Sequence, residues 1–265
     1  MTSFKTFASG SSGNAALLSC GTTHLLIDMG ISCRRICAAL KAAGLAPEDL
    51  TAILITHEHT DHIAGLATYI KKYHTPIFSS PGTSRQLHYR LAGISTLLRP
   101  QPIGQAIPIG DVTVTFLPTS HDCGEGSALR IDTADGSLGY LTDTGYIPEE
   151  TGQRLLGAEL LVLESNHNEE MVRSGPYPYH LKQRVLGPLG HLSNDTAAFY
   201  AASSASAGTR NIILAHLSPE NNTPSLALET VGQALHQAGY RGQLSAAPRD
   251  TAGNLHILEK TICSE

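Results

Sequence analysis

The sequence predicts an α/β fold in which two β-sheets pack face to face and helices cover their outer faces. Short apolar runs typical of strands alternate with segments of helical spacing along the 265 residues. Each half of the chain is rich in strand patterns and closes with a helical segment. The length allows one domain or two, but no linker, charge run or short-period repeat divides the chain. We therefore expect a single domain over residues 1–265.

The first half is expected to begin with three strands joined by short loops. The loop SGSSGN separates the first two strands, and the turn GTT separates the second from the third. A helix should follow, with Ser32 as its N-cap and Gly44 at its end. The segment TAILIT is short, apolar and bounded by polar residues, which predicts a buried strand. The expected strands cover 4–8, 15–20, 24–30, 51–56 and 75–80, and the expected helices cover 32–45, 63–74 and 81–93.

The second half continues the pattern with strands that end in polar side chains. A helix is expected over 193–208, with Ser193 or Asn194 as its cap. Sites in α/β proteins form at strand ends and in the loops that follow them. The expected strands cover 111–121, 127–132, 137–145, 158–168 and 211–222. Four apolar strands of the whole chain run into a residue that can bind metal, namely His57, His121, Asp143 and His216.

The composition excludes several classes of protein. The chain is 41% hydrophobic and 15% charged, which is ordinary for a globular protein. Its formal net charge of −5 is unlike the basic footprint of a protein that grips a duplex backbone tightly. The N-terminus lacks the apolar stretch of a signal peptide, and no run approaches the roughly 18 to 20 apolar residues of a membrane span. We expect a cytoplasmic protein with no membrane partner.

The stretch LITHEHTDHIAGL, which begins at Leu54, places four potential metal ligands within six residues. Histidine is the commonest metal ligand, and aspartate is a common oxygen donor. A tight turn after the strand can direct His57 and His59 to one ion. Asp61 and His62 can then face a second ion. The alternative is a capped loop with solvent-exposed imidazoles.

The remaining ligands should come from distant strand ends. His121 follows FLPTS and would complete a three-histidine site, and His216 in ILAHLS would complete the second site. Asp143 in YLTDTG could bridge two ions with its two oxygens. Taken singly, each of these residues could equally be structural, but their shared placement favours a pair of divalent metal ions. The imidazole-rich set suits Zn, and the carboxylates leave Mn or Fe feasible.

Together, THEHTDHIAGL, His121, TDTG and LAHLS resemble the metallo-β-lactamase superfamily, in the same order and over nearly the whole chain. The resemblance implies an αββα four-layer sandwich of two mixed β-sheets. LLIDMG matches the early Asp-x-Gly of that superfamily, which implies that Asp28 supports the ligands or shapes their loop. Too few residues lie between Asp143 and His216 for the inserted domain of the β-CASP ribonucleases, so no such insertion is expected.

A closer resemblance, to the WalJ (YycJ)-like branch, is carried by FASGSSGNAALL, ESNHN, GPYPYHLKQRVLGPLGHLSN and HLSPENN. That branch is described either as metal-dependent DNA exonucleases or, more broadly, as metallohydrolases. The resemblance implies hydrolysis of phosphodiester bonds, at DNA ends, by a hydroxide held between two metal ions. Asp61 would orient this hydroxide or accept its proton. The branch usually has Asp where this chain has Asn168, which leaves the role of that position open.

Two segments are candidates for contact with a phosphate. His191 in GHLSN, at the start of a predicted helix, resembles the second-half histidine of the superfamily's nucleases, which meets phosphate or protonates the leaving oxygen. A helix-capping histidine is the alternative. The loop SGSSGN could cradle an anion with its backbone N–H groups, or it could be a plain turn. Its candidate residues are Ser11, Ser12 and Asn14.

Two further segments are candidates for contact with the substrate. Asn166 and His167 follow a buried strand, so we expect them near the centre. A small basic and aromatic segment precedes His191 and can contact a nucleic-acid backbone or form a solvated helix face. Its side chains are Arg173, Tyr177, Lys182 and Arg184, of which Lys182 is the candidate for substrate binding.

Other functions remain open on the same residues. One is hydrolysis of a small cyclic phosphodiester or of a thioester, which the acidic net charge favours over a duplex binder. Another is an oxygen-reducing diiron protein, which normally has Glu where this chain has His59. A third is an interaction protein that holds metal without catalysis. The sequence leaves open which metal is native, whether the substrate is DNA or RNA, the direction of cleavage along the strand and the oligomeric state.

Overall fold

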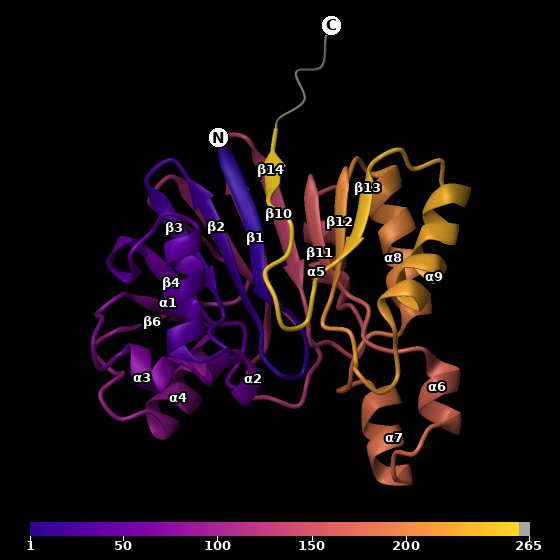
Figure 1. Ribbon diagram of the computed structural model, residues 1–265, viewed down its shortest axis with the longest axis horizontal. Helices are drawn as coiled ribbons and strands as arrows, with labels where there is room; N and C mark the ends of the chain where they lie inside the picture. The colour runs from indigo at the N-terminus through magenta and orange to yellow at the C-terminus, as the bar shows by residue number, and fades with distance from the viewer. Residues whose placement is uncertain (260–265) are drawn as a thin grey trace, which may run out of the picture.

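The computed structural model describes residues 1–259, which form two seven-stranded β-sheets packed face to face with helices on both outer faces (Figure 1). The strands of the first sheet are β1 (Thr2–Ala8), β2 (Ala15–Cys20), β3 (Thr23–Ile27), β4 (Ala52–Leu54), β5 (Ile77–Ser79), β6 (Leu98–Pro100) and β14 (His256–Leu258). Those of the second are β7 (Ala106–Ile109), β8 (Val112–Pro118), β9 (Ser127–Thr133), β10 (Gly136–Leu141), β11 (Leu160–Glu164), β12 (Asn211–Ala215) and β13 (Gln243–Ala246).

The helices divide between the two outer faces (Figure 1). The first half of the chain supplies α1 (Cys33–Ala42), the 3₁₀ turn η1 (Pro47–Asp49), α2 (Thr60–Ile63), α3 (Leu66–Tyr69) and α4 (Pro81–Arg90). The second half supplies α5 (Glu149–Leu155), α6 (Glu169–Ser174), α7 (Tyr179–Leu186), α8 (Asn194–Ser206) and α9 (Pro224–Gln237).

Each sheet mixes antiparallel and parallel pairing. The first has the order β14-β1-β2-β3-β4-β5-β6, antiparallel from β14 to β3 and parallel from β3 to β6. The second has the order β13-β12-β11-β10-β9-β8-β7, parallel from β13 to β10 and antiparallel from β10 to β7. The predicted α/β class and the four-layer sandwich of two mixed sheets are therefore confirmed.

The central strands are apolar on both faces because each sheet is covered on both sides. In β2, Leu18 packs into the core between the sheets, whereas its neighbour Leu17 packs beneath the helices of the first sheet. In β11, Val162 faces the core between the sheets, and Leu161 and Leu163 face the helices on the other side. Successive side chains point to opposite faces of a strand. The runs LLVL and AILI therefore read as continuous apolar segments.

One predicted helix differs from the structure in a way that shapes the site. The segment 63–74 is not one helix, because the chain turns at Gly65 between α2 and α3. The Gly65 N–H donates to the carbonyl of Met29 at 2.9 Å, and a Cβ at Gly65 would lie 2.3 Å from the carbonyl oxygen of Ile31. The helix predicted over 193–208 is confirmed as α8, which Ser193 caps by accepting from the Thr196 N–H at 3.2 Å. His191 lies two residues before this cap, in the loop, and not at the start of the helix.

Several elements have no counterpart in the sequence prediction. These are the strands β6, β7, β13 and β14 and the helices α5, α6, α7 and α9. The Ser32 cap of α1 is confirmed, because its side chain accepts from the backbone N–H of Arg35. Within residues 1–259, the structure has no helix that is long and apolar enough to span a lipid bilayer.

Candidate metal centre

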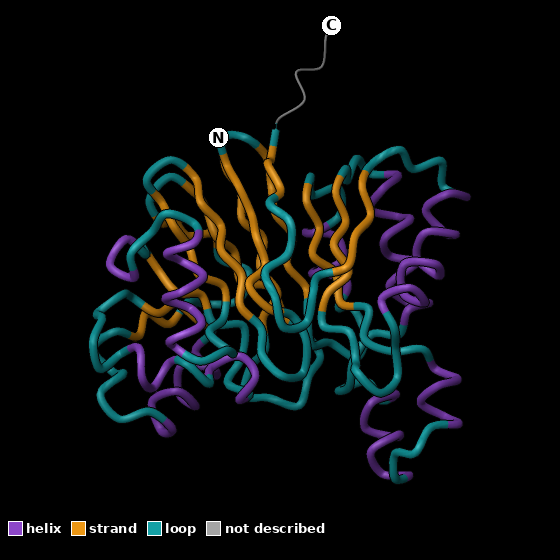
Figure 2. Tube along the Cα trace, in the orientation of Figure 1, coloured by secondary structure: helices purple, strands orange, loops and turns teal. Residues whose placement is uncertain are grey.

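The predicted metal ligands meet in loops that follow the strands at one edge of the sandwich, and the loops at this edge lie at the lower side of Figure 2. Asp28, Asp143 and His216 each follow a strand within two residues. Within residues 1–259 these three are the non-glycine residues with positive φ, at 59°, 56° and 55°. Such a conformation costs on the order of 1–3 kcal/mol, so the surrounding contacts must hold it in place. The left-handed turn directs all three side chains to the same space.

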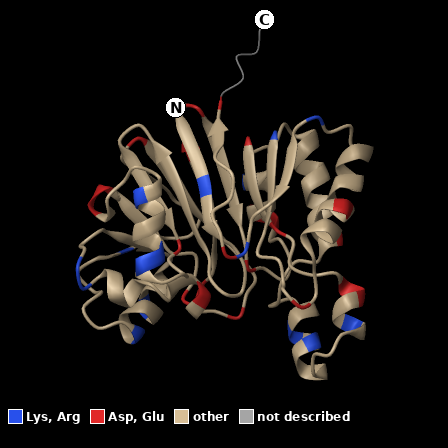
Figure 3. Cartoon of the chain, in the orientation of Figure 1, with Lys and Arg blue, Asp and Glu red and all other residues tan. Residues whose placement is uncertain are grey.

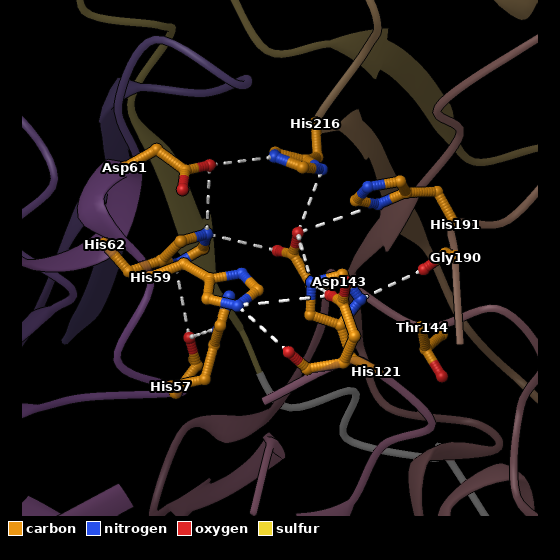
Figure 4. Close-up of polar contacts among 12 residues, drawn as sticks. His57, His59, Asp61, His62, His121, Asp143, Thr144, Gly190, His191 and His216 are labelled. Atoms are coloured by element: carbon orange, nitrogen blue, oxygen red, sulfur yellow. Dashed lines mark hydrogen bonds and ion pairs between the residues drawn. The ribbon is translucent and has the colours of Figure 1, made fainter. Parts of the chain in front are cut away.

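Three histidines, His57, His59 and His121, form the first cluster of potential ligands. Each offers a ring nitrogen, and these nitrogens lie within 4.8 Å of one another. The buried Nε2 of His57 makes no hydrogen bond. His121 donates from Nδ1 to the carbonyl of Gly190 at 3.1 Å, which leaves its Nε2 for the cluster (Figure 4). A buried nitrogen without a partner is costly, so the cluster fits a bound cation.

Asp61, His62 and His216 form a second cluster. The Oδ2 atom of Asp61 lies 3.5 Å from the Nε2 atoms of both His62 and His216. Each ring is oriented from behind by a buried carboxylate: His62 donates from Nδ1 to Asp28 at 2.8 Å, and His216 donates from Nδ1 to Glu164 at 3.0 Å. Carboxylates that orient imidazoles in this way are typical of metal sites. The role predicted for Asp28 agrees with its position behind His62.

Asp143 lies between the two clusters (Figure 4). Its Oδ2 atom is 3.2 Å from His62 Nε2, and its Oδ1 atom is 3.9 Å from His121 Nε2. The side chain is buried, and Oδ2 makes no hydrogen bond. Oδ1 also lies 3.4 Å from His216 Nδ1, so Asp143 approaches rings of both clusters, and its role as a bridging ligand stays a prediction.

The electrostatics of the buried groups favour positive charge at the second cluster. Burial opposes the ionisation of Asp143, but His216 and His62 hold its pKa well below its usual range. Burial also opposes the charged form of His216, yet the carboxylates of Asp143, Asp61 and Glu164 raise its pKa to about 10. A site that attracts a proton so strongly also attracts a metal cation, which takes the proton's place. The clusters therefore have the composition of a dinuclear metal site, and imidazoles with carboxylates suit Zn, Mn or Fe.

Chelation is expected to lower the melting temperature more at about pH 9 than at about pH 6. In the metal-free protein the proton on His216, whose pKa is raised to about 10, contributes stability that is complete below the unfolded-state value near 6.5. This contribution is lost as the pH rises through the folded-state pKa, whereas a bound metal ion keeps its charge. Thermal unfolding with and without EDTA measures the difference in melting temperature between the two forms. A difference that becomes smaller as the pH rises would contradict metal binding at His216.

Glu164 is a residue of the site that the sequence prediction missed. It is the last residue of β11 and is fully buried. Its Oε1 atom accepts from the Nδ1 atoms of both His191 (2.8 Å) and His216 (3.0 Å), and its Oε2 atom accepts from the Thr144 N–H at 2.9 Å. Burial opposes ionisation, but the two histidines lower the pKa of Glu164 to about 2. The sequence did contain a signal for this residue, because Glu164 is a carboxylate at the end of an apolar strand.

A cavity of about 220 Å³ opens over both clusters. His191 lies at its wall, with Nδ1 held by Glu164 and 3.7 Å from Asp143 Oδ1. Of the predicted substrate contacts, Ser11, Asn166 and His191 line the cavity. The Asn166 amide donates to the carbonyl of His216 at 2.8 Å, which ties the two strand ends together.

The structure does not bring Ser12 or Asn14 to the cavity lining. Ser12 is exposed, and its hydroxyl lies 3.3 Å from Asp250. Asn14 is fully buried: its Oδ1 accepts from the Gly10 N–H at 2.8 Å, and its amide donates to the carbonyl of Asp61 at 3.3 Å. The prediction of direct substrate contact is wrong for Asn14, because its polar groups are used to close the SGSSGN loop onto the metal loop.

His167 and Lys182 also lie outside the cavity lining. His167 is buried, and burial lowers its pKa to about 4, so the ring is neutral and turned away from solvent. Lys182 lies on α7, where its ammonium donates to the carbonyl of Arg173 at 2.7 Å. Asn168 caps α6 by accepting from the Met171 N–H at 3.0 Å, a role that Asn and Asp perform equally well.

The chain is similar to known proteins over most of its length. Residues 23–217 match the family model described as the beta-lactamase superfamily domain. The chain is 36% identical to the exodeoxyribonuclease YycJ of Bacillus anthracis, over 89% of this chain and 90% of that protein. It is 37% identical to the exodeoxyribonuclease WalJ of Streptococcus pneumoniae, over 89% of this chain and 88% of that protein. The crystal structure of the metallo-beta-lactamase fold protein YhfI from Bacillus subtilis is similar, with a TM-score of 0.72 and 18% identity, over 96% of this chain and 100% of that one.

Proposed function

Because the chain belongs to the beta-lactamase superfamily domain family and has the metallo-β-lactamase fold, we propose that it is a metal-dependent phosphodiesterase that shortens DNA from an end. The similarity to two proteins named exodeoxyribonucleases, over nearly the full length of each, supports DNA as the substrate. The observation that best supports hydrolysis of a phosphodiester is the position of His191. It lies at the cavity wall beside both ligand clusters, and Glu164 holds its ring.

Seven side chains would hold two divalent ions. His57, His59 and His121 would bind the first ion, Asp61, His62 and His216 would bind the second, and Asp143 would contact both. When bound, a pair of divalent ions lowers the pKa of water and offsets the negative charge that grows on phosphoryl oxygens during in-line attack.

Asp61 and His191 would divide the proton transfers between them. Burial raises the pKa of Asp61, but hydrogen bonds with His216 and His62 outweigh this effect and lower it. Asp61 therefore stays ionised, which its carboxylate must be to orient the attacking water or to accept a proton from it. The Glu164 carboxylate accepts from the Nδ1–H of His191 at 2.8 Å, which leaves Nε2 of His191 to protonate the leaving oxygen. Ser11 and Asn166 would orient the phosphate from the cavity wall.

We expect the purified protein to hydrolyse bis(p-nitrophenyl) phosphate and to shorten an end-labelled DNA strand in the presence of Zn or Mn. A labelled RNA of the same sequence and a thioester are assayed in parallel, because the metals alone do not choose the substrate. Faster cleavage of the DNA strand than of the RNA strand would support DNA as the substrate. Turnover of the thioester alone would contradict phosphodiester hydrolysis, and equal cleavage of RNA would contradict DNA specificity.

A further inference from the structure

A projection formed by α6 and α7 extends past the edge of the sheets (Figure 1). We call residues 169–187 the helical hairpin. One side of the hairpin lines the metal cavity through Tyr177, Leu181 and Arg184. Arg184 also fastens the hairpin to the loop after His121, because its Nε donates to Asp122 at 2.8 Å. The hairpin is therefore part of the cavity wall.

A second groove, of about 280 Å³, lies on the hairpin itself. It is lined by Arg173, Tyr177, Tyr179, Lys182, Gln183 and Leu186. Tyr177 lines both this groove and the metal cavity. The groove and the cavity therefore meet at one aromatic side chain, and an extended ligand could occupy both.

The groove combines aromatic rings with local positive charge. The side chain of Tyr179 is 77% exposed, which is unusual for a large aromatic residue. Residues 171–194 contain no Asp or Glu, although the chain as a whole has a formal net charge of −5. Basic side chains mark both helices of the hairpin in Figure 3. Glu169 pairs with Arg173 at 2.9 Å, whereas Lys182 forms no ion pair within residues 1–259.

We propose that the helical hairpin binds an unpaired DNA strand and guides it to the metal cavity, an inference that rests on the phosphodiesterase function proposed above. Tyr179 and Tyr177 would stack on successive bases, and the Lys182 ammonium would contact the phosphate backbone. Stacking on aromatic side chains with cations along the backbone is how single strands are bound without sequence preference. The bases of a duplex are already stacked on one another, so the occupant is a strand whose end is unpaired.

The charge distribution supports a single strand over a duplex. A tight duplex binder neutralises many phosphates with an extensive basic surface. This chain offers only a short acid-free segment, residues 171–194, within an acidic protein. A few cations and two aromatic rings suffice for a strand of a few nucleotides.

The first test measures binding of a fluorescent oligothymidylate with phosphorothioate linkages to the metal-loaded protein by anisotropy. Tyr179→Ala should weaken binding at least about 5-fold, since stacking contributes about 1–3 kcal/mol per base. Tyr89→Ala is the matched control, because Tyr89 is 80% exposed on α4, and it should change binding less than about twofold. The proposal would be overturned if Tyr179→Ala and Tyr89→Ala bound the single strand with equal affinity. It would also be overturned if Tyr179→Ala weakened binding of a blunt duplex as much as binding of the single strand.

The second test separates the contribution of charge. Lys182→Gln should reduce the slope of log K against log salt concentration by about 0.7 for a single strand, because one phosphate contact is lost. Lys71→Gln, at an exposed lysine after α3, is the control and should leave the slope as in the wild type. An unchanged slope in Lys182→Gln would contradict the phosphate contact.

Hydrolysis of bis(p-nitrophenyl) phosphate distinguishes failure of this inference from failure of the proposed function. This small diester reaches the metal cavity without spanning the hairpin groove, so Tyr179→Ala should impair DNA cleavage at least about 5-fold more than hydrolysis of the small diester. If the wild-type protein hydrolyses neither substrate, the phosphodiesterase function fails. If it hydrolyses both and Tyr179→Ala impairs them equally, only the hairpin's role fails.

Discussion

Replacing Asp61 with alanine is expected to remove about one metal ion per chain and to lower kcat/KM for bis(p-nitrophenyl) phosphate by on the order of 10³-fold. The Asp61 carboxylate lies 3.5 Å from the Nε2 atoms of both His62 and His216, so its loss leaves the second cluster with two imidazoles. The same carboxylate is the proposed acceptor of the proton from the attacking water. One substitution therefore removes a ligand and a base together.

Elemental analysis of the purified variant, alongside the assay, measures both effects. Asp195→Ala is a suitable control, because Asp195 is exposed in the first turn of α8 and makes no contact with either ligand cluster. It should retain the metal and cost no more than about 1 kcal/mol of stability. Full activity or full metal content in Asp61→Ala would reject the role assigned to Asp61.

Glu164→Gln is expected to weaken metal binding about 10- to 100-fold and to lower kcat by a further factor of about 10²–10⁴. Glu164 Oε1 accepts from the Nδ1 atoms of both His191 and His216, so a single buried oxygen orients a proposed ligand and the proposed general acid. The two histidines lower the pKa of Glu164 to about 2, and the carboxylate is therefore charged throughout the neutral range. Glutamine keeps the shape but removes this charge.

A control variant distinguishes the loss of the contact between Glu164 and His191 from a general loss of structure. Glu159→Gln is the matched control. Glu159 lies just before β11, at the opposite end of that strand, where it accepts from the Ser137 N–H at 2.7 Å. Equal losses of activity and of metal in both variants would contradict the positioning role of Glu164.

The metal-ligand pattern could be predicted from sequence because most of it is local. His57, His59, Asp61 and His62 fall within six residues after a buried strand, so a single loop carries four of the seven proposed ligands. The other three follow apolar strands, and strand ends of the same direction meet at one edge of a sheet. The structure brings all seven together, and it also places Asp28 behind His62 at 2.8 Å.

The predictions that failed concern where individual side chains point. Asn14 and His167 were expected at the substrate, but both are buried and neither lines the cavity; the Asn14 amide lies behind the metal loop, 3.0 Å from His62 Nε2. Helix α8 begins at Asn194, so His191 lies in the loop before it and can reach both Glu164 and the cavity. Sequence position alone does not reveal these differences, because each depends on hydrogen bonds to segments far along the chain.

The sequence by itself indicated the fold class through strand periodicity and turn residues, and its closely spaced His and Asp motifs carried the resemblance to the family, because these features are properties of neighbouring residues. Only the tertiary structure decided that Glu164 supports both His191 and His216, and that the helical hairpin forms a wall of the cavity. These features arise where strands and loops separated by many residues pack together. Their geometry is set by left-handed turns at Asp28, Asp143 and His216 and by buried hydrogen bonds between distant segments.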